Sequence, residues 1–485
     1  MPSNGCVRAS PVSRTSQYGT AASLSCDNRA STACGNRATT LPFSLARASV
    51  IEEWDKKISK MRAAEDFEWR TVELRRAGSK LFGRAQAAAA IAERYANEVD
   101  AAARFPSEAI AAARNERLLG TLVPTALGGD GCGFGDVVDV CYVLGRSCAS
   151  TGLIYAMHQT KVACILRHHR AAPWHRQLLR LLSDEQLLLA SSTTEGQNGG
   201  NIRSSSAAVE HADARITLER DATVISYGEH ADGIVTLARR AAGAANTDQV
   251  LCVFRKSDYS LERVLEWDTL GMRGTCSAGF RFKAEGEAAQ ILADPYEKIH
   301  AQTMMPVAHL MWSGTWAGIA AGAVERARLY VRNATRGADG KLPPGAAHLT
   351  QAIAKLRVLR SVVAAGVRRF EAISSDPAAL ETVEFQTYMN LLKVNASEQA
   401  LSTVMSAMQA TGLSGYRNDS QFSIGRYLRD ILSAPIMINN ERILNGVALT
   451  SLVAATPALL RDPDEAADAM TDDEACLQPA RKSIA

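Results

Sequence analysis

The sequence has little that would support metal, disulfide or nucleic-acid chemistry. Its 485 residues include ten cysteines, but none are spaced as Cys-x-x-Cys, so neither a zinc site nor a disulfide framework is indicated. The net charge of +3 is too small to favour nucleic acid or an anionic membrane, and no arginine-rich stripe alternates with aromatic residues. We therefore expect no metal ion, no nucleic-acid partner and a reducing compartment.

No segment has the character of a membrane span. Residues 302–324 lack any formally charged side chain and would be long enough to cross a bilayer. The run contains Pro306, His309 and three glycines, however, so its hydropathy is only moderate. A buried helix within a bundle is the better interpretation, and we expect no membrane span.

The distribution of apolar residues predicts helices at both ends of the chain and strands between them. Apolar residues recur every three or four positions across 349–370 and again across 385–396, which predicts two long helices separated by the Gly- and Pro-containing break at 337–345. Short runs at 233–238 and 250–254 are strand-like. A length of 485 residues is enough for two to four domains.

The first residues have a distinct composition. Residues 1–49 contain five arginines and one acidic residue, Asp27, among many Ser, Thr and Ala. This composition resembles that of a transit peptide, and it also fits a disordered tail or a start codon assigned at the wrong position. The expected location is therefore cytoplasmic, or the mitochondrial matrix if the segment is a transit peptide.

One central stretch carries the clearest chemical signal. An apolar run at 187–190 predicts a short buried strand, and the polar loop 191–200 follows it with hydroxyls and glycines. A second strand is predicted to carry residues 224–228. Hydroxyls and exposed backbone N–H groups can hydrogen-bond the pyrimidine edge of a flavin, and glycines let the backbone approach a ligand. These two segments together predict a flavin-binding seat.

Several short motifs resemble the acyl-CoA dehydrogenase flavoprotein family in order and spacing. They are Leu122-Val123-Pro124 leading into Gly128-Gly129-Asp130-Gly131, Thr194-Glu195, Val224-Ile225-Ser226, and Asp268 to Thr275. The resemblance covers about residues 82–455. It implies a mostly α fold with an N-terminal helical domain, a middle β-barrel or sandwich and a C-terminal four-helix bundle. The expected segments are a weakly structured extension at 1–80, domains at 81–186, 187–300 and 301–460, and an acidic tail at 461–485.

The resemblance also implies the cofactor, FAD, and the residues that hold it. The residues expected to bind it are Ser192, Thr193, Thr194, Gly199, Gly200, Val224, Ser226, Arg336, Gln409 and Gly412. Arg336 resembles the family's pyrophosphate-binding arginine, although Asp339 replaces the usual Phe of that turn, and a solvated loop charge is the alternative. Gln409 and Gly412 resemble the loop that reaches a neighbouring subunit's FAD. A homo-oligomer, a tetramer or a dimer, is therefore expected.

The catalytic carboxylate is the weakest part of the resemblance. In the commonest subgroup the base follows an Arg-Asp pair by about eight residues, but here the position eight residues after Asp430 is Ile438. Glu441 is the nearest carboxylate and the candidate base. The alternative is a glutamate at a helix start, with Asn439 or Asn440 as the helix cap.

The expected reaction is α,β-dehydrogenation of an acyl thioester carried by CoA or a carrier protein, with a flavoprotein or reductase as electron acceptor. The alternatives are a two-component flavin-dependent monooxygenase and a non-catalytic flavin-binding homologue. Three histidine positions bear on this choice. His158 is interpreted as a core or groove residue, His168-His169 as a solvated helix end, and His230 as a surface turn or, on a monooxygenase, a residue beside the ring.

Overall fold

A computed structural model describes residues 80–195 and 202–453, and it begins with helices. These are α2 (Lys80–Ala102), α3 (Ser107–Asn115), α4 (Phe134–Ser147), α5 (Ala149–His168) and α6 (Pro173–Glu185). Helix α5 is buried along most of its length. Apolar and small residues on every side of α5 explain this burial, because a helix without a polar face is stable only inside a core.

Two sheets follow. Their strands are β1 (Leu189–Ser192), β2 (Glu210–Ala212), β3 (Arg215–Ala222), β4 (Gly233–Arg239), β5 (Gln249–Arg255), β6 (Tyr259–Leu265) and β7 (Gly279–Glu287). A three-stranded sheet has the order β1-β4-β5, with β1 parallel to β4, and a four-stranded antiparallel sheet has the order β2-β3-β7-β6. Buried and exposed residues alternate along β3, as expected for a sheet with one face in the core.

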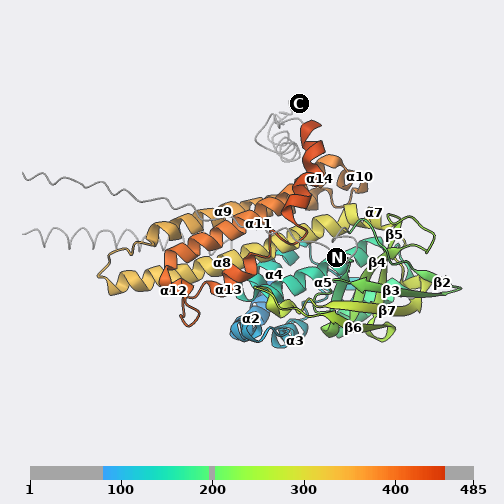
Figure 1. The fold of residues 1–485 in the computed structure, drawn as a ribbon, viewed down its shortest axis with the longest axis horizontal. Helices are drawn as coiled ribbons and strands as arrows, with labels where there is room; N and C mark the ends of the chain where they lie inside the picture. Colours follow the sequence, from blue (N-terminus) through green and yellow to red (C-terminus); the bar gives the residue numbers. More distant parts are fainter. Residues whose placement is uncertain (1–79, 196–201, 454–485) are drawn as a thin grey trace, which may run out of the picture. The chain divides into compact units, whose positions relative to one another are not determined.

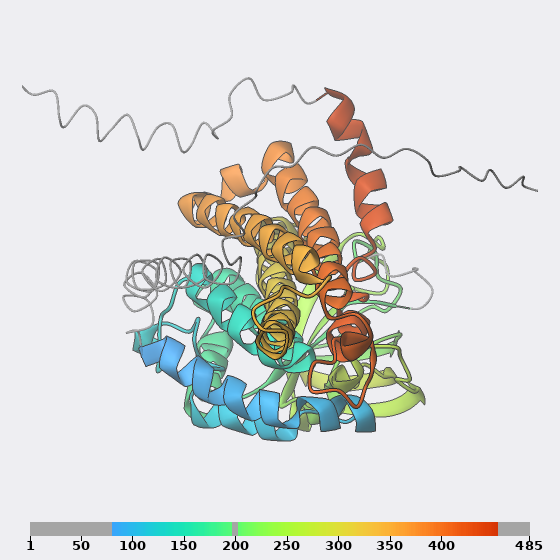
Figure 2. The ribbon, with the colours of Figure 1, turned by 90° about the vertical axis from the view of Figure 1, so that its left-hand side faces the viewer.

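The C-terminal half is helical. Its elements are α7 (Tyr296–Ile299), a π-helical turn (His300–Met304), α8 (Met305–Gly337), α9 (Ala346–Ile373), α10 (Pro377–Leu380), α11 (Val383–Thr411), α12 (Leu413–Tyr416), α13 (Gly425–Ile431) and α14 (Asn440–Val453). The long helices α8, α9 and α11 lie side by side (Figures 1 and 2). Helix α8 also packs on α4, and glycine allows the approach: a Cβ on Gly318 would lie 2.3 Å from the carbonyl oxygen of Tyr142.

The predicted fold class is confirmed, since helices precede and follow a central β region. The uncharged run 302–324 falls in the π-helical turn and the first half of α8, where it is buried. Across 80–195 and 202–453, no helix combines the length and the apolar character that crossing a bilayer requires. The six cysteines of these ranges form no disulfide.

One predicted strand is wrong. Residues 224–228 follow the end of β3 at Ala222 and form a turn instead. Tyr227 has φ 44°, in the left-handed region, which is incompatible with an extended strand. The segment keeps one sheet-like bond, from the Ile225 amide to the Ala278 carbonyl at 2.9 Å.

Candidate functional site

The end of β1 is held by a buried arginine from β3. Arg220, whose side chain is fully buried, donates to the carbonyl oxygens of Ser192 at 3.1 Å and Thr194 at 3.0 Å. Glu195 balances its charge at 3.5 Å and accepts the backbone N–H of Ser206 at 2.6 Å. This buried pair fixes the backbone of the loop in which the sequence predicts cofactor contacts. Arg220 is not among the residues that the resemblance predicts.

A histidine joins β1 to α5. The backbone N–H of Leu189 donates to Nδ1 of His158 at 3.0 Å, so Nε2 carries the proton and donates to the Leu119 carbonyl at 2.9 Å. Burial lowers the pKa of His158 to about 4, which keeps the ring neutral. The interpretation of His158 as a core residue is confirmed.

The second predicted cofactor segment lies against the first. The Tyr227 hydroxyl donates to the carbonyl oxygen of Leu189 at 3.0 Å. The neighbouring Ser226 belongs to a row of hydroxyls: Ser277 Oγ donates to Ser226 Oγ at 2.8 Å and lies 2.7 Å from Thr275 Oγ1. The structure therefore places Tyr227 of this turn against Leu189, the first residue of β1, although 38 residues separate the two in the sequence.

The polar atoms of this seat fit a ligand with donors and acceptors along one edge. Ser192 Oγ is buried and has no hydrogen-bond partner among the residues that the structure describes. Such a hydroxyl costs about 1–3 kcal/mol unless a ligand satisfies it. Thr193 and Thr194, which follow Ser192 in the sequence, are half-buried. Val224 is half-buried as well, and Ser226 is buried. The predicted Gly199 and Gly200 lie outside the described residues.

Arg336, Gln409 and Gly412 lie elsewhere in the chain. All three are exposed, at the C-terminal ends of α8 and α11, which Figure 1 places at the end of the bundle away from the strands. The turn after α8 meets the end of α11, because a Cβ on Gly345 would lie 2.2 Å from the carbonyl oxygen of Ala410. Gly412 has φ 53° and ψ −135°, a conformation that favours glycine. Within one chain, Arg336, Gln409 and Gly412 therefore do not lie beside Ser192 and Ser226.

Glu441 lies on the first turn of α14, and its side chain is exposed. The Asn439 side chain accepts the backbone N–H groups of Glu441 at 2.9 Å and Arg442 at 3.4 Å. These are the contacts expected if Glu441 is a glutamate at a helix start and Asn439 is the helix cap. Ile438, at the position where the family's commonest subgroup has the base, has φ 57°.

The Arg429-Asp430 pair holds the structure around α13. Arg429 forms an ion pair with Asp100 of α2, and Asp430 Oδ1 accepts the backbone N–H of Met272 at 2.7 Å. Burial raises the pKa of Asp430 to about 6. These contacts link α13 to neighbouring elements, and they give neither Arg429 nor Asp430 a catalytic role.

The prediction for His168 is wrong. It is buried, with Nδ1 2.9 Å from Asp294 Oδ2 and Nε2 2.8 Å from Thr303 Oγ1. Both partners are more than 120 residues away in the sequence, so local composition did not reveal them. His230 is exposed and stacks on Phe105, with ring centroids 4.1 Å apart, which matches the surface-turn interpretation.

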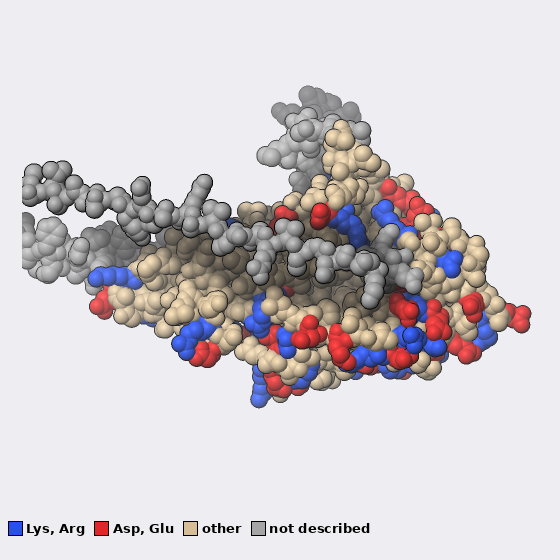
Figure 3. All heavy atoms as spheres, in the orientation of Figure 1, with Lys and Arg blue, Asp and Glu red and all other residues tan. Residues whose placement is uncertain are grey.

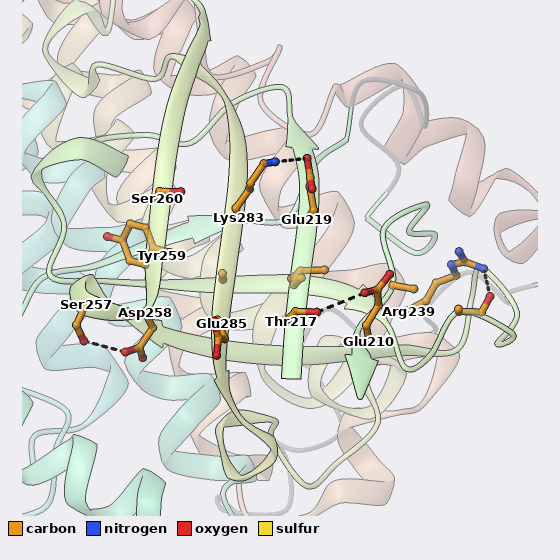
Figure 4. Close-up of a pocket in the computed structure, with 14 residues that line it drawn as sticks. Glu210, Thr217, Glu219, Arg239, Ser257, Asp258, Tyr259, Ser260, Lys283 and Glu285 are labelled. Atoms are coloured by element: carbon orange, nitrogen blue, oxygen red, sulfur yellow. Dashed lines mark hydrogen bonds and ion pairs between the residues drawn. The ribbon is translucent and has the colours of Figure 1, made fainter. Parts of the chain in front are cut away.

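Two cavities lie outside the seat. One, of about 660 Å³, lies over the four-stranded sheet (Figure 4), where Lys283 pairs with Glu219 at 3.1 Å and Thr217 with Glu210 at 3.4 Å. The other, of about 590 Å³, is lined by arginines near α13. Within residues 80–195 and 202–453, no cluster of three or more His, Cys, Asp or Glu side chains could hold a metal ion.

Comparison with known proteins identifies the class. Residues 83–185 match the family described as acyl-CoA dehydrogenase, N-terminal domain, and residues 300–444 match the family described as acyl-CoA dehydrogenase, C-terminal domain. The chain belongs to the acyl-CoA dehydrogenase family. It is 24% identical over 361 residues to cyclohex-1-ene-1-carbonyl-CoA dehydrogenase of Geobacter metallireducens, which covers 73% of this chain and 92% of that protein.

Solved structures of similar fold include monooxygenases. FMN-bound TdsC of Paenibacillus sp. A11-2, a dibenzothiophene monooxygenase, has a TM-score of 0.67 at 19% identity, covering 78% of this chain and 98% of that one. The methanesulfinate monooxygenase MsuC of Pseudomonas fluorescens has a TM-score of 0.64 at 17% identity, with the same coverage. At these identities the likeness establishes the fold alone.

Proposed function

We propose that this protein is an FAD-dependent oxidoreductase and that the flavin ring binds between the end of β1 and the turn at 224–227. The observation that carries the proposal is the buried, unpartnered hydroxyl of Ser192, together with the hydroxyl row that ends at Ser226. Thr193, Thr194 and Val224 complete this side of the seat. A bound flavin would act as the acceptor of a hydride.

The proposed reaction is α,β-dehydrogenation of an acyl thioester. The Geobacter relative acts on a CoA thioester, and a thioester carbonyl acidifies the α-proton that a base must remove. Glu441 is the proposed base, and a flavoprotein or reductase would take the electrons onward. The role proposed for Glu441 requires its carboxylate, now exposed on α14, to reach the α-carbon of the substrate.

Anaerobic titration of the full chain with acyl-CoA and acyl-carrier thioesters tests this reaction. A substrate should bleach the flavin absorbance without oxygen. Glu441→Gln should lose several orders of magnitude in the bleaching rate, whereas Glu93→Gln, which changes an exposed glutamate of α2, should not change it. If no thioester of the panel bleaches the flavin, this reaction is wrong.

A second candidate, a two-component flavin-dependent monooxygenase, is favoured by the position of Glu441. Ile438 occupies the expected base position, and Asn439 holds Glu441 at a helix start. Under this alternative, the protein given reduced flavin and a substrate should take up oxygen and release an oxygenated product, and Glu441→Gln should leave that rate unchanged. If neither thioesters nor oxygen yield product, the non-catalytic flavin-binding alternative stands.

We further propose a homo-oligomer in which Arg336, Gln409 and Gly412 complete the site of a neighbouring subunit. Figure 3 shows charged side chains gathered over the strands, while the visible part of the bundle is largely uncharged. Large apolar side chains near the proposed contacts are exposed, including Leu413 at 72% and Tyr416 at 75%. Exposed apolar residues of this size are typical of surfaces that a partner covers.

A further inference from the structure

The arginine-lined cavity of about 590 Å³ shares no lining residue with the flavin seat. The C-terminal part of α2, the middle of α8, the 3-10 turn at Arg273, and α13 with the loop before it surround the cavity. Its charged lining consists of Arg273, Arg326, Arg426 and Arg429, with Asp100 as the single carboxylate. Three positive charges therefore remain after Asp100 is counted against the four arginines.

Neutral acceptors, not carboxylates, hold most of these guanidinium groups. Arg273 donates to the carbonyl oxygen of Asp100 at 2.8 Å, and Arg326 donates to that of Gln421 at 2.8 Å. Asp268 lies 3.6 Å from Arg273, but its side chain is 95% exposed, where water screens an ion pair strongly. Only Arg429 has a close carboxylate partner in the cavity lining, Asp100.

Arg426 is the least satisfied of the four. Its Nε donates to Asn97 Oδ1 at 3.2 Å and its Nη2 to the Ser147 carbonyl at 3.4 Å, while its Nη1 is buried without a partner among the described residues. Arg426 and Arg326 approach the same ring, that of Tyr427, with guanidinium carbons 4.8 and 5.9 Å from the centroid. Two like charges thus converge on one side chain, and Asp430 and Asp100 are the carboxylates close enough to attract Arg426.

Neutral hydrogen-bonding groups lie beside the arginines. A Cβ on Gly425 would lie 3.1 Å from Asn418 Oδ1, 3.4 Å from Arg429 Nη1 and 3.5 Å from Ser423 Oγ, so these three side chains surround one glycine. The guanidinium of Arg429 and the hydroxyl of Ser423 can donate to phosphate oxygens, and the Asn418 amide has a donor only on its nitrogen, not on Oδ1. Arginine suits this role because its planar fork pairs two oxygens at once.

We propose that this cavity binds the diphosphate group of a phosphorylated ligand, with Arg426, Arg326 and Arg429 as its main cationic contacts. The diphosphate could come from a nucleotide, from coenzyme A or from free inorganic diphosphate. The proposed site uses none of the residues proposed for the flavin seat, so its failure would leave the proposed function intact.

Calorimetric titration of the full chain with inorganic diphosphate, ADP and coenzyme A tests the proposal, after the chain has been loaded with FAD and the unbound FAD removed. The added FAD excludes the flavin seat as the place where ADP or coenzyme A binds. We expect one ligand per chain, binding that weakens as salt rises, and at least tenfold weaker binding in Arg426→Gln. Arg426→Lys keeps the charge without the fork and should weaken binding less. Arg360→Gln, which changes an exposed arginine of α9, is the matched control and should not alter binding.

The three ligands distinguish the source of the diphosphate. Tighter binding of ADP than of diphosphate supports a nucleotide, tighter binding of coenzyme A supports the coenzyme, and equal binding of all three supports the inorganic anion. If the Arg426→Gln variant fails to fold, Arg326→Gln gives the same test. The Arg326 side chain donates a hydrogen bond to the carbonyl oxygen of Gln421 in the loop before α13. The proposal is overturned if none of the three ligands binds at physiological ionic strength, or if the Arg426→Gln and Arg326→Gln variants bind as tightly as the Arg360→Gln control.

Discussion

Arg220 provides the sharpest test of how the loop after β1 is built. Replacing it with Met would leave Glu195 buried without its cation and would remove the donor to the carbonyl oxygens of Ser192 and Thr194. Breaking a buried ion pair by removing one partner costs about 3–5 kcal/mol. We therefore expect Arg220→Met to lower the free energy of unfolding by about that amount and to weaken flavin binding.

The same strand offers the matched control. Arg215 pairs with Glu285 at 2.7 Å, but the two side chains are 53% and 66% exposed. Exposed pairs contribute little, so Arg215→Met should unfold near the wild-type denaturant midpoint and bind flavin as the wild type does. Urea unfolding and flavin titration of both variants are the assays. Equal midpoints for the two variants, or unchanged flavin affinity in a destabilised Arg220→Met, would refute the reasoning.

Three further predictions concern burial, packing and association. Burial lowers the pKa of Lys161 to about 8, and its amine has only Met304 Sδ, at 3.0 Å, as a hydrogen-bond partner in the described part of the chain. The unfolded amine binds its proton more tightly, so wild-type stability falls as the pH drops from 10.5, the ordinary pKa of lysine, to about 8. Lys161→Met should therefore be more stable by up to about 3 kcal/mol at pH 7, with a smaller gain at pH 10; a gain that does not change with pH would contradict this. Gly271→Ala should cost at least about 1–3 kcal/mol in thermal unfolding, because its Cβ would lie 2.1 Å from the backbone oxygen of Arg429, and an unchanged midpoint would argue against this close approach. Leu413→Asp should reduce the oligomer to smaller species on light scattering, and a wild-type monomer that retains its flavin would remove the basis of the subunit proposal.

The sequence predicted the features that depend on local pattern. Apolar spacing at 349–370 and 385–396 corresponds to α9 and α11, and the runs at 233–238 and 250–254 correspond to β4 and β5. The uncharged run 302–324 is buried in a bundle, as expected. These agreements arise because helix and strand periodicity is written in neighbouring residues.

Features that depend on distant partners were not predictable in the same way. His168 looks solvated among its neighbours, yet it is buried because Asp294 and Thr303 supply partners from other elements. Arg220 left a faint signal, since it occupies an inward position of the alternating strand β3. A charged residue in that register requires a buried partner, and only the fold identifies Glu195 as that partner.

The visible absorption spectrum of the full-length chain, purified after incubation with FAD and then desalted, tests the central claim most directly. Flavin bands at one cofactor per chain, reduced in Arg220→Met but not in Arg215→Met, are the predicted result. A colourless protein that takes up neither FAD nor FMN would contradict the account.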